Sequence, residues 1–288
     1  MKGLTMPTLI PFDENSWLPT VDALIAKYKA CTVPFFIDAL SAAGQPTGDA
    51  QLLGTGFFVT CRQHVFLVTA AHVLKDLDPR RVLATNVKGQ AVLLGGLPFL
   101  LCHDNDLAIT LLPQDWLANT GLPSINSIVL DETWEGYESL EFWITVGYPG
   151  SKNGIFPKLG KHAINSHGTS FTEVIEKPTA AAHISNPVGF RFDKKKAVDS
   201  ANKRANPPSF SGTSGSPVLE VIARVDPAGN ISLRCTLKGV LLGWYKQEKE
   251  VIAGRAQALI DLIDELLDLL HAERQQTATT ASLQMPPT

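Results

Sequence analysis

Short runs of apolar residues, separated by turn residues, follow one another from about residue 50 onward. Residues 54–60 and 65–69 form two such runs on either side of the polar stretch 61–64, an arrangement typical of a β-hairpin. Since the runs are rich in Val, Ile, Thr and Phe, they predict a mainly β fold. Further strands are predicted at residues 81–87, 90–94, 107–112, 140–146, 218–223, 231–235 and 239–244.

Helical periodicity is confined to two places. Near the N-terminus, apolar residues spaced i, i+3, i+4 and i+7 from Val21 to Tyr28 predict a short helix capped by Thr20. Residues 254–273 predict one long helix. The apolar stripe by which it would dock on a core comprises Leu259, Leu262, Ile263, Leu266 and Leu270.

These patterns divide the chain into three parts. We expect an N-terminal extension over residues 1–49 and one folded domain over residues 50–274, which ends in the long helix. Residues 275–288 are small and polar and predict a disordered tail. Within the domain, residues 150–208 are rich in turn residues and show no clear period.

Composition narrows the class of protein. Apolar residues make up 44% of the 288 residues and charged residues 18%, which predicts a folded chain with a sizeable core. The net charge of −3 argues against a dedicated nucleic-acid binder. The longest apolar run, residues 91–102, is interrupted by glycine and proline and is too short to span a membrane. The first residues lack a signal-peptide pattern, so we expect no membrane association.

The cysteines give no sign of metal or redox chemistry. Cys31, Cys61, Cys102 and Cys235 are widely spaced, and no C-x-x-C pair occurs among them. We therefore expect neither a metal nor a cofactor. Four unpaired thiols are typical of a reducing compartment, which predicts a cytoplasmic protein.

The most informative stretch surrounds Ser214, which follows Gly212 by two residues and directly precedes Gly215. Glycines permit backbone conformations that let several N–H groups point to one place. The stretch predicts an oxyanion hole formed by the N–H groups of Gly212 and Ser214, beside the Ser214 hydroxyl. By itself, the same stretch also fits a plain Gly/Ser turn.

A serine nucleophile needs a base and a carboxylate that orients the base. His72 directly follows an apolar strand and is preceded by small residues, which leaves room for a substrate. Asp106 precedes another apolar strand, where a carboxylate must be hydrogen-bonded to be tolerated. Asp104 lies two residues earlier and is an alternative for the same role.

These motifs resemble the trypsin-like serine peptidases of the chymotrypsin fold. The resemblance rests on the residues around His72, on those around Asp106, and on the sequence from Gly212 to Pro217. It implies two six-stranded antiparallel β-barrels with the active site between them, and a closing C-terminal helix. It also implies that Ser214 is the nucleophile, His72 the general base and acid, and Asp106 the orienting carboxylate of an endopeptidase that acts on proteins or peptides.

The resemblance further implies a substrate-binding cleft. Its residues would be Pro208, Ser209, Ser211, Leu242, Gly243 and Trp244. No Asp or Glu occurs between residues 201 and 219 or between 236 and 245. Because a desolvated Lys or Arg side chain needs a charged partner, we expect cleavage after an uncharged residue, with Trp244 or Tyr245 narrowing the cleft.

Departures from the family pattern predict a different mode of control. Secreted members carry an aspartate before the nucleophile that pairs with a newly cut N-terminus, whereas this chain has Thr213. Val73 and Phe210 stand where secreted members have cysteines, and Ser216 replaces a glycine. The likeness is therefore to intracellular bacterial members, and we expect no activation by N-terminal cleavage. We expect control to come instead from ordering of the loop before Ser214, together with the basic segment 191–204 of net charge +4, by a regulatory protein partner or by the substrate.

One other function remains open at this stage. A trypsin-like barrel can be catalytically silent and serve as a peptide- or partner-binding module. The presence of all three triad residues argues against this alternative, but a sequence does not show whether the loop around Gly212 has the active conformation. The basic segment favours a solvated loop over a nucleic-acid site, since no aromatic residues are interleaved for base stacking.

Overall fold

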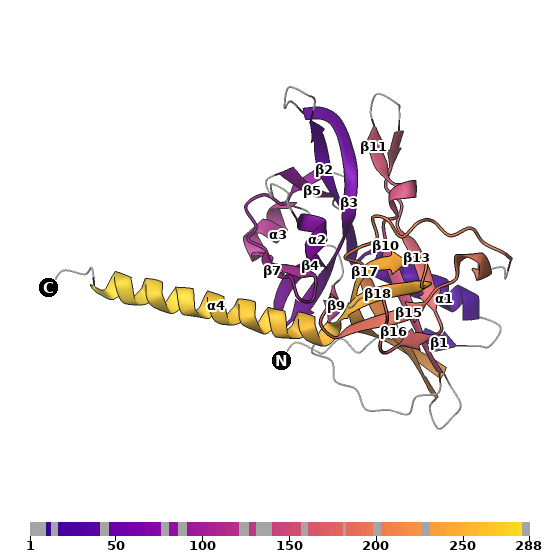
Figure 1. Cartoon of the computed structure of the whole chain (residues 1–288). Coiled ribbons are helices and arrows are strands. Elements are labelled where there is room, and N and C mark those ends of the chain that lie inside the picture. Colours follow the sequence, from indigo (N-terminus) through magenta and orange to yellow (C-terminus); the bar gives the residue numbers. More distant parts are fainter. Residues whose placement is uncertain are drawn as a thin grey trace.

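The strands form two mainly antiparallel sheets that share a core (Figure 1). The computed structural model describes residues 10–12, 17–40, 46–75, 81–85, 91–120, 127–130, 140–156, 161–180, 183–197, 203–225 and 231–283. The all-β, chymotrypsin-like architecture expected from the sequence is confirmed. The sheets carry ten and eight strands over the described residues, however, rather than six each.

The first sheet is built mainly from the N-terminal half of the chain, with its last two strands added from the other half. Its strands are β2 (Thr32–Leu40), β3 (Pro46–Cys61), β4 (His64–Ala70), β5 (Val82–Thr85), β6 (Ala91–Leu93), β7 (Leu100–Cys102), β8 (Leu107–Leu111), β9 (Ile128–Val129), β11 (Gly154–Phe156) and β12 (Lys161–Ala163). The main order is β6-β5-β2-β3-β4-β8-β7, with β9 and β11 also paired to β3. The predicted hairpin joins β3 to β4, and its turn residues Arg62 and Gln63 both have positive φ, as a two-residue type I′ turn requires.

The second sheet contains the remaining strands. They are β1 (Ile10–Phe12), β10 (Leu140–Gly147), β13 (His167–Phe171), β14 (Val174–Ile175), β15 (Pro187–Arg191), β16 (Pro217–Val225), β17 (Ile231–Tyr245) and β18 (Glu250–Arg255). The order is β13-β10-β16-β17-β18-β15-β14, with β1 paired to β17. The strands predicted at 231–235 and 239–244 are one continuous strand, β17.

The helices lie outside the sheets. They are α1 (Trp17–Lys29), α2 (Ala71–Leu74), α3 (Gln114–Thr120) and α4 (Ala256–Leu283), together with the short 3₁₀ turns η3 (Gly150–Lys152) and η5 (Lys194–Lys196). Helix α1 begins at Trp17, so Thr20 lies inside it rather than at its cap. Helix α4 projects from the body of the molecule (Figure 1) and continues past its expected end, so residues 275–283 are helical. Residues 284–288 and parts of the extension lie outside the described residues.

One apolar cluster joins the two sheets and both long helices. Phe57 and Phe66 contribute from the first sheet, Ile144 and Val240 from the second, and all four are fully buried. Each such side chain contributes roughly 2–3 kcal/mol through burial. From α4, Leu259, Leu262, Ile263 and Leu267 are buried in the same cluster. The shared core fixes the two sheets relative to each other, which matters because the candidate site draws on both. Over the described residues, no helix is long and apolar enough to cross a membrane.

Candidate active site

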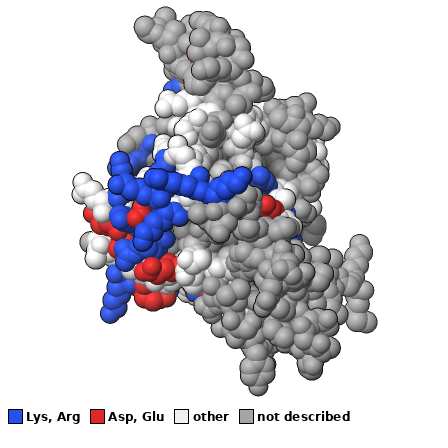
Figure 2. All heavy atoms as spheres, turned by 90° about the vertical axis from the view of Figure 1, so that its right-hand side faces the viewer, with Lys and Arg blue, Asp and Glu red and all other residues white. Residues whose placement is uncertain are grey.

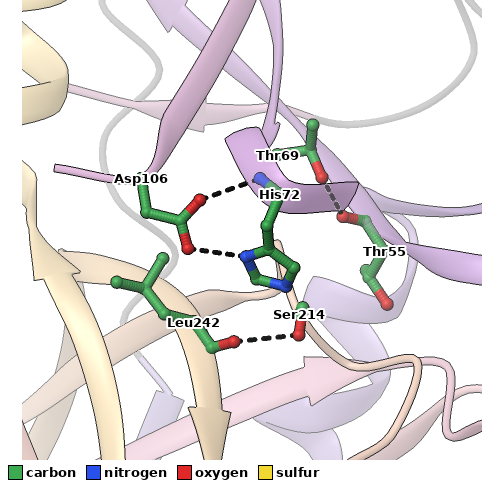
Figure 3. A network of polar contacts seen from close by, with 6 residues as sticks. All are labelled: Thr55, Thr69, His72, Asp106, Ser214 and Leu242. Atoms are coloured by element: carbon green, nitrogen blue, oxygen red, sulfur yellow. Dashed lines mark hydrogen bonds and ion pairs between the residues drawn. The ribbon is translucent and has the colours of Figure 1, made fainter. Parts of the chain in front are cut away.

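Asp106 and His72 lie at adjacent strand ends of the first sheet and are joined by two hydrogen bonds (Figure 3). His72 Nδ1 lies 2.6 Å from Asp106 Oδ2, and the His72 backbone N–H donates to Asp106 Oδ1 at 2.8 Å. A carboxylate oxygen accepts, so this contact places a proton on Nδ1 and leaves Nε2 as the basic nitrogen. In Figure 3, that second nitrogen is turned toward Ser214. The pair has the geometry of an oriented general base.

The backbone around Asp106 explains why this carboxylate, and not its neighbour, meets the histidine. Asp106 has a φ of 52°, in the left-handed region that Asp tolerates better than most residues. Its carbonyl accepts from Ala71 N at 3.0 Å, which holds the turn against the start of α2. Asp104 is exposed, and its carbonyl instead accepts from Ser185 N. Of the two candidates from the sequence, the structure brings Asp106 to His72.

Ser214 enters the site on the tight turn that leads into β16. Its hydroxyl donates to the carbonyl of Leu242 at 2.9 Å, as Figure 3 shows. Leu242 is the extra residue where the pairing of β17 with β18 shifts register between Leu241 and Gly243. A bulge of this kind turns a carbonyl out of the strand ladder, which is why Leu242 can accept from the serine.

Two glycines shape the turn that carries Ser214. Gly212 has a φ of 84° and Gly215 a φ of 88°, a region that favours glycine. A Cβ atom on Gly212 would lie 2.5 Å from Leu52 Cδ2, and one on Gly215 would collide with the carbonyl of Thr55. Within the described part of the chain, no hydrogen bond uses the amide N–H of Gly212 or of Ser214. Both remain available as donors to an incoming oxyanion.

Residues 213 and 216, which depart from the family pattern, close this turn locally. The buried Thr213 donates from both its N–H and its hydroxyl to the carbonyl of Phe210, at 3.0 and 2.6 Å. The Ser216 hydroxyl, also buried, donates to the Thr213 carbonyl at 2.6 Å. Gly147 leaves space for it, since a Cβ there would collide with Ser216 Oγ. The turn is thus held by hydroxyl groups in the chain as it stands.

Thr55 on β3 is a residue of this site that sequence reasoning missed. Its hydroxyl donates to the Gly212 carbonyl and accepts from the Tyr148 N–H, both at 3.0 Å, and its own N–H donates to the Ser214 carbonyl at 2.8 Å. The residue is completely buried. Thr55 therefore links the first sheet to both sides of the peptide segment that holds the nucleophile. The flanking glycines at 54 and 56 were the only signal in the sequence.

Of the residues expected to line the cleft, those before Ser214 are partly or fully exposed, whereas Trp244 packs against other aromatic side chains. Pro208 and Ser209 are half-buried and Ser211 is exposed, next to Gly150, whose N–H donates to the Ser211 carbonyl. The Trp244 ring packs against Phe192 and Phe210, with centroids 5.9 and 5.8 Å apart. Trp244 thus packs with Phe192 and Phe210 in an aromatic cluster on the second sheet.

Two ionisable groups near the expected cleft, Tyr245 and Glu250, bear on which substrates it could bind. Burial, followed by the charges of Asp106 and Glu248, raises the pKa of Tyr245. Glu250 is the one acidic side chain that is buried among the described residues. It accepts hydrogen bonds from the N–H groups of Thr179 and Ala180 and from the Thr179 hydroxyl. Glu250 is thus committed to holding this loop rather than to a cationic substrate.

Groups suited to metal or redox chemistry are missing from this region. Over the described residues, no group of three His, Cys, Asp or Glu side chains is placed to hold a metal ion. All four cysteines are free thiols. What the site presents is an oriented imidazole, a serine hydroxyl and two free amide donors.

Comparisons with known proteins add only a likeness in fold. No protein-family model matches this sequence, and no curated protein matches it significantly. The chain is similar to the serine protease domain of the Sesbania mosaic virus polyprotein, at 14% identity and a TM-score of 0.43, over 81% of this chain and 91% of that one. It is also similar to the HtrA-type protease AlgW solved with a tripeptide, at 10% identity and a TM-score of 0.48; the match covers 84% of this chain and 62% of that one.

A third solved structure concerns coupled folding and binding of the intrinsically disordered VPg protein of Sesbania mosaic virus, driven by aromatic interactions. It matches at 15% identity and a TM-score of 0.42, over 79% of this chain and 86% of that chain. Likenesses of this size carry no information about activity. The function is therefore inferred from the geometry of the site itself.

Proposed function

We propose that the chain is a serine endopeptidase that hydrolyses peptide bonds through Ser214, His72 and Asp106. The observation that carries this proposal is the paired contact of one carboxylate with both the ring and the backbone of His72, with the free ring nitrogen directed at a serine. A carboxylate oriented in this way fixes the tautomer and stabilises the imidazolium that forms during acyl transfer.

The reaction would begin with a change at the Ser214 hydroxyl. In the structure this hydroxyl donates its hydrogen bond to the Leu242 carbonyl. Once the hydroxyl turns toward His72, its proton passes to Nε2 as Oγ bonds to the substrate carbonyl carbon. The carbonyl π electrons move to oxygen, and the N–H groups of Gly212 and Ser214 bind that oxyanion. His72 then returns the proton to the leaving nitrogen as the C–N bond breaks. Water, deprotonated by His72, hydrolyses the acyl-enzyme in the same way.

The Leu242 carbonyl allows a bound substrate to release the Ser214 hydroxyl. A peptide that donates a backbone N–H to Leu242 competes with the serine for the same acceptor and releases the hydroxyl toward His72. The hydrogen bond to be displaced is worth about 1 kcal/mol net, which a docked peptide easily offsets. No cleavage of the N-terminus is needed for this step, because Thr213 and Ser216 already close the turn.

Alanine replacements test the proposal directly. Ser214→Ala and His72→Ala should each remove nearly all hydrolysis of a fluorogenic peptide library, by roughly 10⁴-fold or more, and the double variant should lose little more because the groups act as a unit. A fluorophosphonate probe should label Ser214 in wild type and in Asp104→Ala, but not in Ser214→Ala. Peptide binding without turnover or labelling in folded wild type would instead identify a catalytically silent binding module.

A further inference from the structure

A groove separate from the triad opens on the second sheet, beside its edge strand β13. It has a volume of about 910 Å³ and is lined by β13 and the two residues after it, by α1 through Val21, Asp22 and Ile25, and by parts of the segments 191–197 and 205–207. None of the three triad residues lines it. The groove is therefore a second concave surface with no role in the proposed hydrolysis.

From Gly168 to Phe171, one edge of β13 faces the groove without a strand partner among the described residues. β13 pairs with β10 on one side, and over the described residues no strand pairs with it on the other. At the far end of the same sheet is β14, which pairs with β15 alone. An exposed strand edge offers main-chain N–H and C=O groups to an extended chain, which can bind by adding a strand.

Helix α1 packs against β13 at one side of the groove. A Cβ atom on Gly168 would lie 2.6 Å from Ile25 of α1, so helix and strand are in close contact there. The floor of the groove is apolar, with Phe171 and Phe192 buried and 6.0 Å apart. Main-chain groups at the edge and apolar atoms at the floor suit an extended peptide better than a small polar ligand.

The charge on the rim selects the kind of peptide. Lys and Arg side chains gather on the face that Figure 2 shows, with acidic side chains among them. At the groove, Arg191 is paired with Glu173 and Lys249 with Asp193. Lys194, Lys195 and Lys196 of η5 make no salt bridge within the described part of the chain, and Lys195 and Lys196 are exposed. The surplus positive charge on this side favours an acidic occupant.

We propose that this groove binds an extended acidic peptide segment of a partner protein, which adds to the edge of β13 and directs its carboxylates toward Lys196, the one lysine of η5 that lines the groove. Asp22 lines the groove from α1, so the carboxylates of the peptide lie on the side of η5. The binding surface is distinct from the cleft that receives the peptide to be cut.

Fluorescence anisotropy on the full-length Ser214→Ala protein tests the proposal, since that variant does not consume the probe. The probe is a fluorescein-labelled octapeptide that alternates glutamate with valine. Lys196→Glu should weaken its binding about tenfold, whereas Asp22→Asn should strengthen it. Lys177→Glu is the matched control, because it changes the net charge equally at an exposed residue outside the groove and should leave the affinity unchanged.

Two further arms examine how the probe binds. An octapeptide N-methylated on alternate residues should lose affinity, because it cannot donate main-chain hydrogen bonds to β13. Wild type blocked at Ser214 by a fluorophosphonate should bind the probe as well as the Ser214→Ala variant does. If the proposed hydrolysis were wrong, no block would form but the binding results would stand, so the two proposals fail separately.

Several outcomes would overturn the inference. Equal weakening by Lys196→Glu and Lys177→Glu would show general electrostatic attraction. Loss of binding upon blocking of Ser214 would place the peptide in the catalytic cleft. Tighter binding of a single-stranded RNA dodecamer than of the octapeptide, with the same dependence on Lys196, would identify a nucleic-acid surface instead.

Discussion

Replacing Thr55 by valine removes one hydroxyl from the contact between the two sheets while it keeps the shape of the side chain. The hydroxyl donates to Gly212 and accepts from Tyr148, and the residue is fully buried. Valine satisfies neither partner, and a buried polar group left without a partner costs about 1–3 kcal/mol. We therefore expect the free energy of unfolding to fall by about 2–5 kcal/mol, measured by urea denaturation.

The same substitution should reduce catalysis in the protein that remains folded. Without the Thr55 hydroxyl, the Gly212 carbonyl loses its anchor. The peptide unit between Gly212 and Thr213 can then rotate and shift the two neighbouring units, which carry the donor N–H groups of Gly212 and Ser214. Complete loss of one such donor costs about 10²–10³ in kcat; partial misplacement should cost about 10–100-fold, with KM little changed. Steady-state kinetics on a fluorogenic peptide, at a temperature at which the variant is fully folded, measures this.

Two controls separate positioning from general loss of stability. Thr55→Ser keeps the hydroxyl and should retain kcat near that of wild type. Thr110→Val alters a threonine that is equally buried but lies on β8, where its hydroxyl has one long contact of 3.4 Å with the Leu111 carbonyl; kcat should not change. A Thr55→Val protein with normal kcat, or a Thr55→Ser protein as impaired as Thr55→Val, would refute the assignment.

Four other expectations can be tested on the same protein. Profiling with a peptide library diverse at the residue before the cut should give cleavage after small or medium apolar residues in protein whose intact N-terminus is verified by mass; dominant cleavage after Lys or Arg would contradict this. Gly212→Ala should abolish turnover, because its Cβ would lie 2.5 Å from Leu52 Cδ2 at a φ of 84°, and a normal rate would show that the loop is not held as described. Burial raises the pKa of Cys31 and Cys235 from 9.0 to about 11. The thiols of the unfolded chain therefore ionise first, so the free energy of unfolding should fall between about pH 9 and 11. Separately, thiol titration of the denatured protein should find four free thiols, and fewer would indicate a disulfide.

Sequence motifs indicated the candidate triad because His72 and Asp106 each stand at the end of a strongly apolar strand. His72 follows β4 and Asp106 precedes β8, and these strands are neighbours in the sheet. Two side chains at the same end of adjacent strands lie close together. The order of the apolar runs was therefore enough to predict that His72 and Asp106 are neighbours. The family resemblance had already favoured Asp106 over Asp104. The structure adds a physical reason, the positive φ of Asp106, which no local sequence pattern indicates.

Other parts of the fold left little trace in the sequence. β2 falls in the expected N-terminal extension, yet it is a central strand between β3 and β5. Its residues Val33, Phe35 and Phe36 are all buried, and a strand buried on both faces lacks the alternation by which strands are recognised. β11 to β15 are two to five residues long, too short to show any period. The groove beside β13 depends on these strands and was therefore invisible.

The arrangement of hydrogen bonds also suggests where control of the proposed activity resides. In a peptidase that is activated by cleavage, a new charged N-terminus orders the oxyanion loop. Here that ordering is divided between local hydroxyl groups, at Thr213 and Ser216, and one hydroxyl from the opposite sheet, at Thr55. The structure contains all three of these hydrogen bonds, so the loop is ordered without an ion pair to a new N-terminus. The remaining barrier is the bond from Ser214 to the Leu242 carbonyl, and a docked peptide can displace it. We therefore propose that the substrate itself controls this site, because the Ser214 hydroxyl turns to His72 only when a peptide backbone takes its place at the Leu242 carbonyl.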